Sequence, residues 1–435
     1  MEENTEALVL SQGRENKDEE LYLINEFKSL LGEAGFSSKH MFIQNLKEVD
    51  PKTYFGKGKI EEVANFCRSF NADCEPSERI SYIACNFDLS ALQKKNIEKI
   101  IGLDVIDRTN VILNIFEKNA KTKEAILQVE IAKLNYLKNH LINEKASYSQ
   151  VTSGGGKHNK GEGEKQLELN RRVIRKSIMV KSKELESIKM ARRNSRNKRK
   201  NSPIYKIGIV GYTNVGKSTL VNSLLEYCKK NENKSVLSRD SLFATLETST
   251  RLIDGFRYPS FLVTDTVGFC SDLPICLIDA FRSTLEEITE SDLLIHVVDV
   301  SSPFKQLQID TTNQILKEIG VDNIPLIYFY NKYDLLTNPL PTLPKENELY
   351  ISLKDGNDME QILDFIYKSL FKEPAIEVVF PYEGNFKEFL SDNYVLRYEE
   401  KENGYKCSVK MNPKTIFKYN YLLKWRSFKA LRYSS

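Results

Sequence analysis

The stretch Gly211-Tyr212-Thr213-Asn214-Val215-Gly216-Lys217-Ser218 decides how the middle of this chain folds. It follows an apolar run, Ile207-Gly208-Ile209-Val210, and precedes a segment in which Leu220, Leu224 and Leu225 recur at helical spacing. A buried strand, a glycine-rich loop and a helix in this order form a P-loop. The two glycines let the backbone turn its N–H groups, and the helix N-terminus, toward phosphate oxygens. The sequence therefore predicts a nucleotide-binding α/β domain around this loop.

Further polar residues follow apolar runs downstream of the loop. Phe261-Leu262-Val263-Thr264 leads to Asp265, whose carboxylate is expected to hold the water shell of Mg²⁺, and the Gly268 N–H is expected to reach the γ-phosphate. In the loop itself, Lys217 should contact the β- and γ-phosphates, and the Ser218 hydroxyl should bind Mg²⁺. The spacing thus indicates a nucleoside triphosphate held with a metal ion.

A third motif identifies the base. The run 325–330 ends in Asn331-Lys332-Tyr333-Asp334, and the Asp334 carboxylate can accept from both guanine N1–H and the exocyclic amine, a pair that adenine lacks. Ser352-Leu353-Lys354 follows another strand and could contact the guanine carbonyl oxygen. All these residues lie at carboxyl ends of predicted strands, where open α/β sheets bind ligands. We expect one GTP/GDP site formed by Gly211, Tyr212, Thr213, Asn214, Val215, Gly216, Lys217, Ser218, Thr219, Asp265, Asn331, Lys332, Asp334, Ser352, Leu353 and Lys354.

The segment 242–251 between the P-loop and Asp265 is a candidate switch ordered by the γ-phosphate. Thr245 is the candidate for the second Mg²⁺ hydroxyl, with Thr248 and Thr250 as alternatives, although ordinary strand threonines would give the same pattern. The expected metal ligands are Ser218, Thr245 and Asp265, and the expected catalytic groups are Lys217, Thr245 and Gly268.

Composition bounds the rest of the chain. The 435 residues suggest about three domains. No apolar stretch approaches the ~20 residues of a membrane span, and seven Cys without a Cys-x-x-Cys pair fit a reducing cytoplasm. We expect a disordered acidic tail over residues 1–19, an α/β domain over 20–118, a helical hairpin over 119–202, a nucleotide domain over 203–373 and a small α+β domain over 374–435.

The expected hairpin has two helices around a glycine-rich loop at 147–163. Its apolar positions recur at helical spacing, at Leu127, Ile131, Leu134, Leu137 and Leu141 and then at Leu167, Ile174, Ile178, Leu185 and Ile188. The net charge is only +3, yet the second helix is strongly basic. Its cations are Arg171, Arg172, Arg175, Lys176, Lys181, Lys183, Arg192, Arg193, Arg196, Lys198, Arg199 and Lys200. Such a stripe is typical of a phosphate-backbone binder, or else of a solvated linker.

Together these motifs resemble the HflX family of translation-associated GTPases. Thr53-Tyr54-Phe55-Gly56-Lys57-Gly58-Lys59, Asp107-Arg108-Thr109 and Gln128-Val129-Glu130 are similar to its amino-terminal domain, Phe243-Ala244-Thr245-Leu246 to its switch, and Asp265-Thr266-Val267-Gly268-Phe269 to its magnesium motif. The glycine-rich loop departs from the family pattern, with His158 for a glycine, Lys160 for arginine and Glu162 for proline.

The resemblance implies a Ras-like P-loop GTPase domain at 203–373 and a monomeric cytoplasmic protein. It also implies binding to the large ribosomal subunit, with the hairpin reaching ribosomal RNA and GTP controlling attachment or subunit splitting. Phe269 stands where Ras-like GTPases carry a water-orienting glutamine, so turnover by the chain alone should be slow. Asn214 matches a position that ligates K⁺ in some such GTPases, or is a turn-forming Asn.

Two other functions stay open at the level of sequence. One is an RNA-binding or assembly module that uses GTP as a structural ligand, for which Phe269 is the chief argument. The other is a tRNA-modifying GTPase, which would need its own reactive Cys or cofactor site. Near the C-terminus, the basic aromatic stretch from Lys418 to Arg432 is expected to pack as core, with RNA stacking as the alternative.

Overall fold

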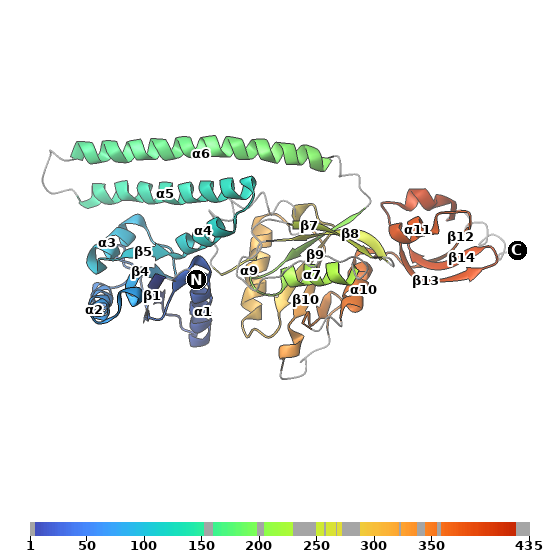
Figure 1. Ribbon diagram of the computed structural model, residues 1–435, viewed down its shortest axis with the longest axis horizontal. Helices are drawn as coiled ribbons and strands as arrows, with labels where there is room; N and C mark the ends of the chain where they lie inside the picture. The colour runs from blue at the N-terminus through green and yellow to red at the C-terminus, as the bar shows by residue number, and fades with distance from the viewer. Residues whose placement is uncertain are drawn as a thin grey trace. The chain divides into compact units, whose positions relative to one another are not determined.

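The computed structural model describes residues 5–151, 160–197, 204–228, 249–255, 258–266, 268–271, 288–321, 323–336, 344–354 and 358–422 (Figure 1). The chain divides into two compact units. The first contains Met1–Asn194, Ser241–Glu247 and Ser271–Arg282, and the second contains Ser195–Asp240, Thr248–Cys270 and Ser283–Ser435.

The first unit begins with a parallel sheet whose strands alternate with helices. The strand order is β2-β1-β4-β5, with β3 also paired to β1, and every pairing is parallel. Helices are expected to cover a parallel sheet, because its strands need crossover connections. The elements are β1 (Thr5–Gln12), α1 (Lys17–Ala34), β2 (Phe36–Ser37), β3 (Met41–Gln44), α2 (Lys57–Asp73), η1 (Pro76–Glu78), β4 (Ile80–Cys85), α3 (Ala91–Ile101), β5 (Asp104–Asp107) and α4 (Arg108–Asn119).

The strand β1 shows that the prediction of a disordered acidic tail over residues 1–19 was wrong. Residues Thr5–Gln12 form an inner strand of this sheet, and Ala7, Leu8, Val9 and Leu10 are fully buried. The acidic residues around this short apolar run suggested a solvated segment. Four adjacent apolar side chains are enough for a strand that is covered on both faces, because such a strand need not alternate with polar residues.

Two long helices follow, α5 (Lys123–Val151) and α6 (Lys160–Asn197). They lie side by side (Figure 1), and the ion pairs Lys123–Glu184 and Lys181–Glu130 join them in antiparallel register. This confirms the hairpin. The helices extend into both ends of the expected loop at 147–163, because adding a residue to an existing helix is easier than starting a new one. Residues 152–159, including His158, lie outside the described residues.

The buried face of α5 is rotated from the predicted stripe. Leu127 is buried, but Leu137 is 49% exposed, and the other buried positions are Ala125, Gln128, Val129, Ala132 and Tyr136. Packing against α3 and α4 selects this face, and it includes the small and polar side chains that a purely apolar pattern overlooks. On α6, Leu185 is buried as expected.

The second unit contains a six-stranded sheet in the order β11-β10-β9-β6-β8-β7. Only the pairing of β7 with β8 is antiparallel. The parallel strands β6, β8, β9, β10 and β11 therefore bring their carboxyl ends to one edge. The elements are β6 (Tyr205–Val210), α7 (Lys217–Cys228), β7 (Ser249–Gly255), β8 (Tyr258–Asp265), β9 (Leu293–Asp299), α9 (Lys305–Glu318), β10 (Leu326–Asn331), η2 (Tyr333–Leu335), β11 (Glu348–Tyr350) and α10 (Met359–Leu370).

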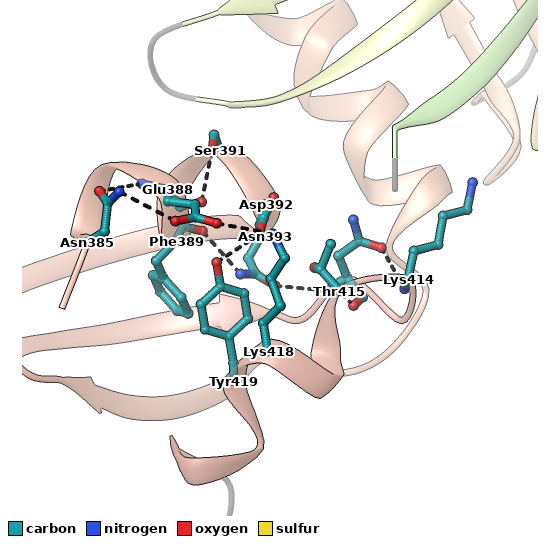
Figure 2. Close-up of polar contacts among 11 residues, drawn as sticks. Asn385, Glu388, Phe389, Ser391, Asp392, Asn393, Lys414, Thr415, Lys418 and Tyr419 are labelled. Carbon is teal, nitrogen blue, oxygen red and sulfur yellow. Dashed lines mark hydrogen bonds and ion pairs between the residues drawn. The ribbon is translucent and has the colours of Figure 1, made fainter. Parts of the chain in front are cut away.

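The same unit ends in a small antiparallel sheet, which completes the predicted multidomain α/β architecture. The strand order is β12-β14-β13. The elements of this region are β12 (Ile376–Phe380), α11 (Phe386–Asp392), β13 (Tyr394–Lys401), β14 (Gly404–Lys410) and η3 (Ile416–Tyr419). Asp392 accepts from Lys418 Nζ at 2.9 Å and from the Tyr419 hydroxyl at 2.8 Å, and Figure 2 shows these three side chains together. The described start of the basic aromatic stretch thus packs within this sheet domain, while 423–435 lie outside the described residues.

Within the described part of the chain, every helix is too short or too polar to cross a bilayer.

Candidate nucleotide site

The glycine-rich loop between β6 and α7 requires its glycines. Gly211 has φ +146° and Gly216 has φ +99°, in the region that L side chains rarely adopt. A β-carbon at Gly211 would lie 2.3 Å from the Val297 carbonyl oxygen, and one at Gly216 would lie 2.4 Å from Asn331 Nδ2. Asn214 also has a positive φ of 60°, which Asn tolerates better than most residues. Sterics therefore fix the curvature of the loop.

Lys217 lies inside this loop. Its side chain is 7% exposed, and Nζ donates to Gly211 O at 3.0 Å and to Tyr212 O at 2.5 Å. Burial lowers the pKa of Lys217 to about 8, and the nearby Asp265 carboxylate opposes this shift. A cation held against carbonyl oxygens in a dry pocket is poised to interact with an anion. Gly268 closes one side, since a β-carbon there would lie 2.9 Å from Lys217 Nζ.

Ser218 and Asp265 meet beside the lysine. The Ser218 hydroxyl donates to Asp265 Oδ2 at 2.7 Å, and Asp265 is 3% exposed at the end of β8. A hydroxyl and a carboxylate are the hard oxygen donors that Mg²⁺ takes, usually one or two from the protein with phosphate and water completing the shell. The described residues contain no group of three His, Cys, Asp or Glu side chains able to hold a metal by themselves. This donor set fits Mg²⁺ shared with phosphate.

The segment after Asp265 pairs with the P-loop. Phe269 N–H donates to Gly211 O at 3.2 Å, and Thr213 N–H donates to Phe269 O at 2.7 Å. The Phe269 side chain is 1% exposed. This pairing is non-local and could not be found from sequence spacing. It holds an apolar side chain in the interior at the position where a polar one would orient water.

The base-reading motif is tied directly to the P-loop through Asn331. This side chain is 4% exposed, its Nδ2 donates to Val215 O at 2.8 Å, and its Oδ1 accepts from Leu353 N–H at 3.3 Å. The Ser352 hydroxyl donates to Asp334 Oδ1 at 2.9 Å. The structure thus brings the Asn331–Asp334 motif, the Ser352–Lys354 segment and the P-loop together at one sheet edge.

Asp299 is a residue that sequence reasoning missed. It ends β9, and its Oδ2 forms an ion pair with Lys332 Nζ at 2.7 Å, while Lys332 has a left-handed φ of 63°. The run 293–298 is apolar except for His296 and is followed by Asp, as the run before Asp265 is, so this partial signal could have been used. This contact fixes the backbone that leads to Asp334.

The switch threonines are only partly described. Thr245 and Thr248 lie outside the described residues. Thr250 lies on β7, and its hydroxyl shares a 3.0 Å hydrogen bond with Thr264 on β8, an arrangement typical of a strand threonine.

A P-loop on β6, an aspartate at the end of β8 and an Asn-Lys-x-Asp motif at the end of β10 define a P-loop GTPase domain. Family models match most of the chain: 22–117 as "GTP-binding GTPase N-terminal", 119–199 as "GTP-binding GTPase Middle Region" and 206–332 as "50S ribosome-binding GTPase". The chain belongs to the HflX family of GTPases, enzymes that hydrolyse GTP.

Two relatives similar in sequence support this membership. A GTPase HflX from Caldanaerobacter subterraneus subsp. tengcongensis is 38% identical over 370 residues, or 84% of this chain and 81% of that protein. The Escherichia coli GTPase HflX is 33% identical over 393 residues, or 89% and 88% of the two chains. A crystal structure of a GTP-binding protein from Sulfolobus solfataricus in complex with GDP matches 85% of this chain and 99% of that one, with 26% identity and a TM-score of 0.43.

Proposed function

We propose that this protein binds the large ribosomal subunit under the control of GTP and acts in ribosome splitting, recycling or rescue. Membership of a family whose GTPase domain is described as 50S ribosome-binding supports the partner. The observation that carries the nucleotide part is the Asn331 side chain, which links the P-loop carbonyl of Val215 to Leu353 beside the base-reading residues. One ligand can therefore span both ends of the site.

In this proposal the chain's own residues do the positioning. The P-loop N–H groups and Lys217 bind the phosphates, Gly268 N–H binds the γ-phosphate, and Asp334 accepts from the guanine edge. Ser218 and Asp265, with Thr245, would hold Mg²⁺, which supplies neutralising charge at the phosphates when bound. Because the lysine is already desolvated and lies beside carbonyl oxygens, little reorganisation is needed to exchange those contacts for phosphate oxygens.

The buried Phe269 argues for activation by a partner. An apolar side chain that is 1% exposed cannot orient the attacking water. We propose that a rearrangement on the ribosome, or K⁺ held with the help of Asn214, supplies the missing group. The isolated chain would then hydrolyse GTP slowly, and large subunits would accelerate it.

The outer face of α6 is the proposed RNA contact. Arg172, Arg175, Lys176 and Lys183 are exposed there, whereas Lys181 is paired with Glu130 on α5. Glu130 and Glu184 are thus paired between the helices, and among the described side chains of α6, Glu168 and Glu186 are the acidic residues exposed beside these four cations. Phosphate-rich RNA is the partner that such a face fits best. We further propose that the protein acts as a monomer in the cytoplasm, with the ribosomes.

Co-sedimentation and single-turnover hydrolysis with purified large subunits test this proposal. Binding should weaken with salt, and replacing Arg172, Arg175 and Lys176 by Gln should reduce the log–log salt slope by roughly 2 to 3. A matched control replaces three exposed cations elsewhere, Lys345, Lys368 and Lys401, and should leave the slope unchanged. If wild-type protein neither sediments with large subunits nor hydrolyses GTP faster in their presence, the ribosomal function is wrong.

A tRNA-modifying activity is less well supported. Such chemistry needs a reactive Cys or a cofactor site. Cys67, Cys85 and Cys407 are buried, and burial raises the pKa of each thiol above its ordinary value. Cys270 is also fully buried. Among the described cysteines these four are therefore poor nucleophiles.

A further inference from the structure

The carboxylate of Asp107 joins the amino-terminal sheet to the root of the helical hairpin. Asp107 ends β5, is 0% exposed and caps α4 by accepting from Asn110 N–H at 2.9 Å. Its Oδ2 accepts from the Tyr136 hydroxyl on α5 at 2.7 Å, and His140 Nε2, one turn further along α5, lies 3.8 Å away. One buried side chain therefore contacts the sheet, α4 and α5.

This contact specifies where α5 docks. A buried carboxylate is costly unless donors surround it, and burial raises the pKa of Asp107 while the bonds from Asn110 and Tyr136 oppose that shift. Apolar packing alone tolerates small sliding of a helix, but a hydroxyl must meet the carboxylate at one distance and angle. The root of the hairpin is thus held by a directional bond.

The next residue, Arg108, holds a different part of the chain. It is 2% exposed, forms an ion pair with Glu26, donates to Asn86 Oδ1 at 2.7 Å and donates through Nη2 to the Ser271 carbonyl at 2.9 Å. Ser271 belongs to the same compact unit as Arg108. In the chain it comes two residues after Phe269, whose backbone pairs with the P-loop.

We propose that the consecutive residues Asp107 and Arg108 transmit the nucleotide state to the helical hairpin. Arg108 holds the chain at Ser271, immediately after the segment that contacts the P-loop, and Asp107 holds α5 through Tyr136. Both side chains leave the same backbone turn between β5 and α4, so a displacement of Ser271 changes the position of the carboxylate that docks α5. These are positioning residues, and the inference rests on the proposed nucleotide control of the hairpin.

We call this coupling through Asp107 and Arg108 the relay. Hydrogen exchange of the full chain, without ribosomes, tests it. We expect backbone amides in residues 123–140 of the wild type to exchange at rates that differ about fivefold or more between GDP and a non-hydrolysable GTP analogue, since allosteric couplings are typically of this size. Tyr136→Phe removes only the hydroxyl, and Arg108→Lys cannot contact Glu26, Asn86 and Ser271 together. Each variant should reduce the difference to less than twofold while nucleotide affinity stays unchanged.

Tyr54→Phe is the matched control, because its hydroxyl donates to Gln12 Oε1 at 2.9 Å in the same unit and not to Asp107. It should keep the wild-type difference, and thermal unfolding should show that each variant is folded. If the wild type shows no nucleotide-dependent exchange in α5, or if Tyr136→Phe keeps it, the relay is wrong. Failure of large-subunit binding with an intact exchange difference would instead overturn the proposed function and leave the relay standing.

Discussion

Replacing Asn331 by Ala should separate the two halves of the nucleotide site. The change removes the bond from Nδ2 to Val215 O at 2.8 Å and the bond from Leu353 N–H to Oδ1 at 3.3 Å. Asn331 is 4% exposed, so the groups left behind sit in an interior with little water. Each backbone group that loses its partner there costs about 1–3 kcal/mol.

Two such groups give roughly 2–6 kcal/mol, and relaxation of the loop or entry of water into the space left by the side chain lowers the upper end to about 4 kcal/mol. If this energy is regained only when the site is re-formed around the ligand, GDP affinity should fall by roughly 30-fold to 1,000-fold, because about 1.4 kcal/mol corresponds to a factor of ten. Titration with a fluorescent GDP analogue measures the effect directly.

Asn71 offers a matched control. Its amide makes the same two kinds of bond, donating to Ile80 O at 2.9 Å and accepting from Ile80 N–H at 2.8 Å, in the other compact unit. Asn71→Ala should lower thermal stability and leave GDP affinity unchanged. A change of less than twofold in GDP affinity for folded Asn331→Ala would refute the reasoning that this side chain holds the site together.

Three further predictions concern single positions. Asp334→Asn should weaken GTP binding and favour xanthosine triphosphate, whose C2 carbonyl can accept from the Asn amide; competition titration would contradict this if guanine selectivity is unchanged. Burial lowers the pKa of Lys217 to about 8, so its ammonium charge is lost as pH rises through that value. GTP affinity should therefore fall roughly fivefold between pH 8 and about pH 9. A GTP affinity that does not change with pH would argue against this lysine as the phosphate ligand. Asn214→Ala should remove any stimulation of hydrolysis by K⁺ over Na⁺, measured as phosphate release, and persistent stimulation would rule out Asn214 as the ligand.

The motifs at strand ends were predictable because each consists of a short apolar run followed by residues with special backbone or charge requirements. Gly211 and Gly216 are examples, since their positive φ values and close neighbours leave no room for a side chain. The link through Asn331 could not be predicted, because Val215 and Leu353 lie far from it in the chain. Only the parallel strand order brings them together.

The errors at the amino terminus and in the hairpin have a shared physical cause. Local composition around Ala7–Leu10 is acidic, and the pairing of β1 with β3 and β4 depends on residues at least 32 positions away. In α5, the apolar spacing pointed to Leu137, but Gln128 and Tyr136 are buried instead, and the Tyr136 hydroxyl donates to the Asp107 carboxylate. Tertiary partners, which the sequence pattern does not identify, decided both cases.

In the relay proposed above, the pairing of Phe269 with the P-loop connects hydrolysis to hairpin position. Its N–H donates to Gly211 O, its carbonyl oxygen accepts from Thr213 N–H, and its ring is buried. This segment must therefore rearrange before one of its polar groups can help to orient water. The same segment ends at Ser271, which Arg108 holds. Binding couplings are reciprocal. Suppose that docking of the hairpin on the large subunit favours one arrangement of residues 265–271. The nucleotide that favours the same arrangement must then increase the affinity for the subunit. The subunit must increase the affinity for that nucleotide by the same factor.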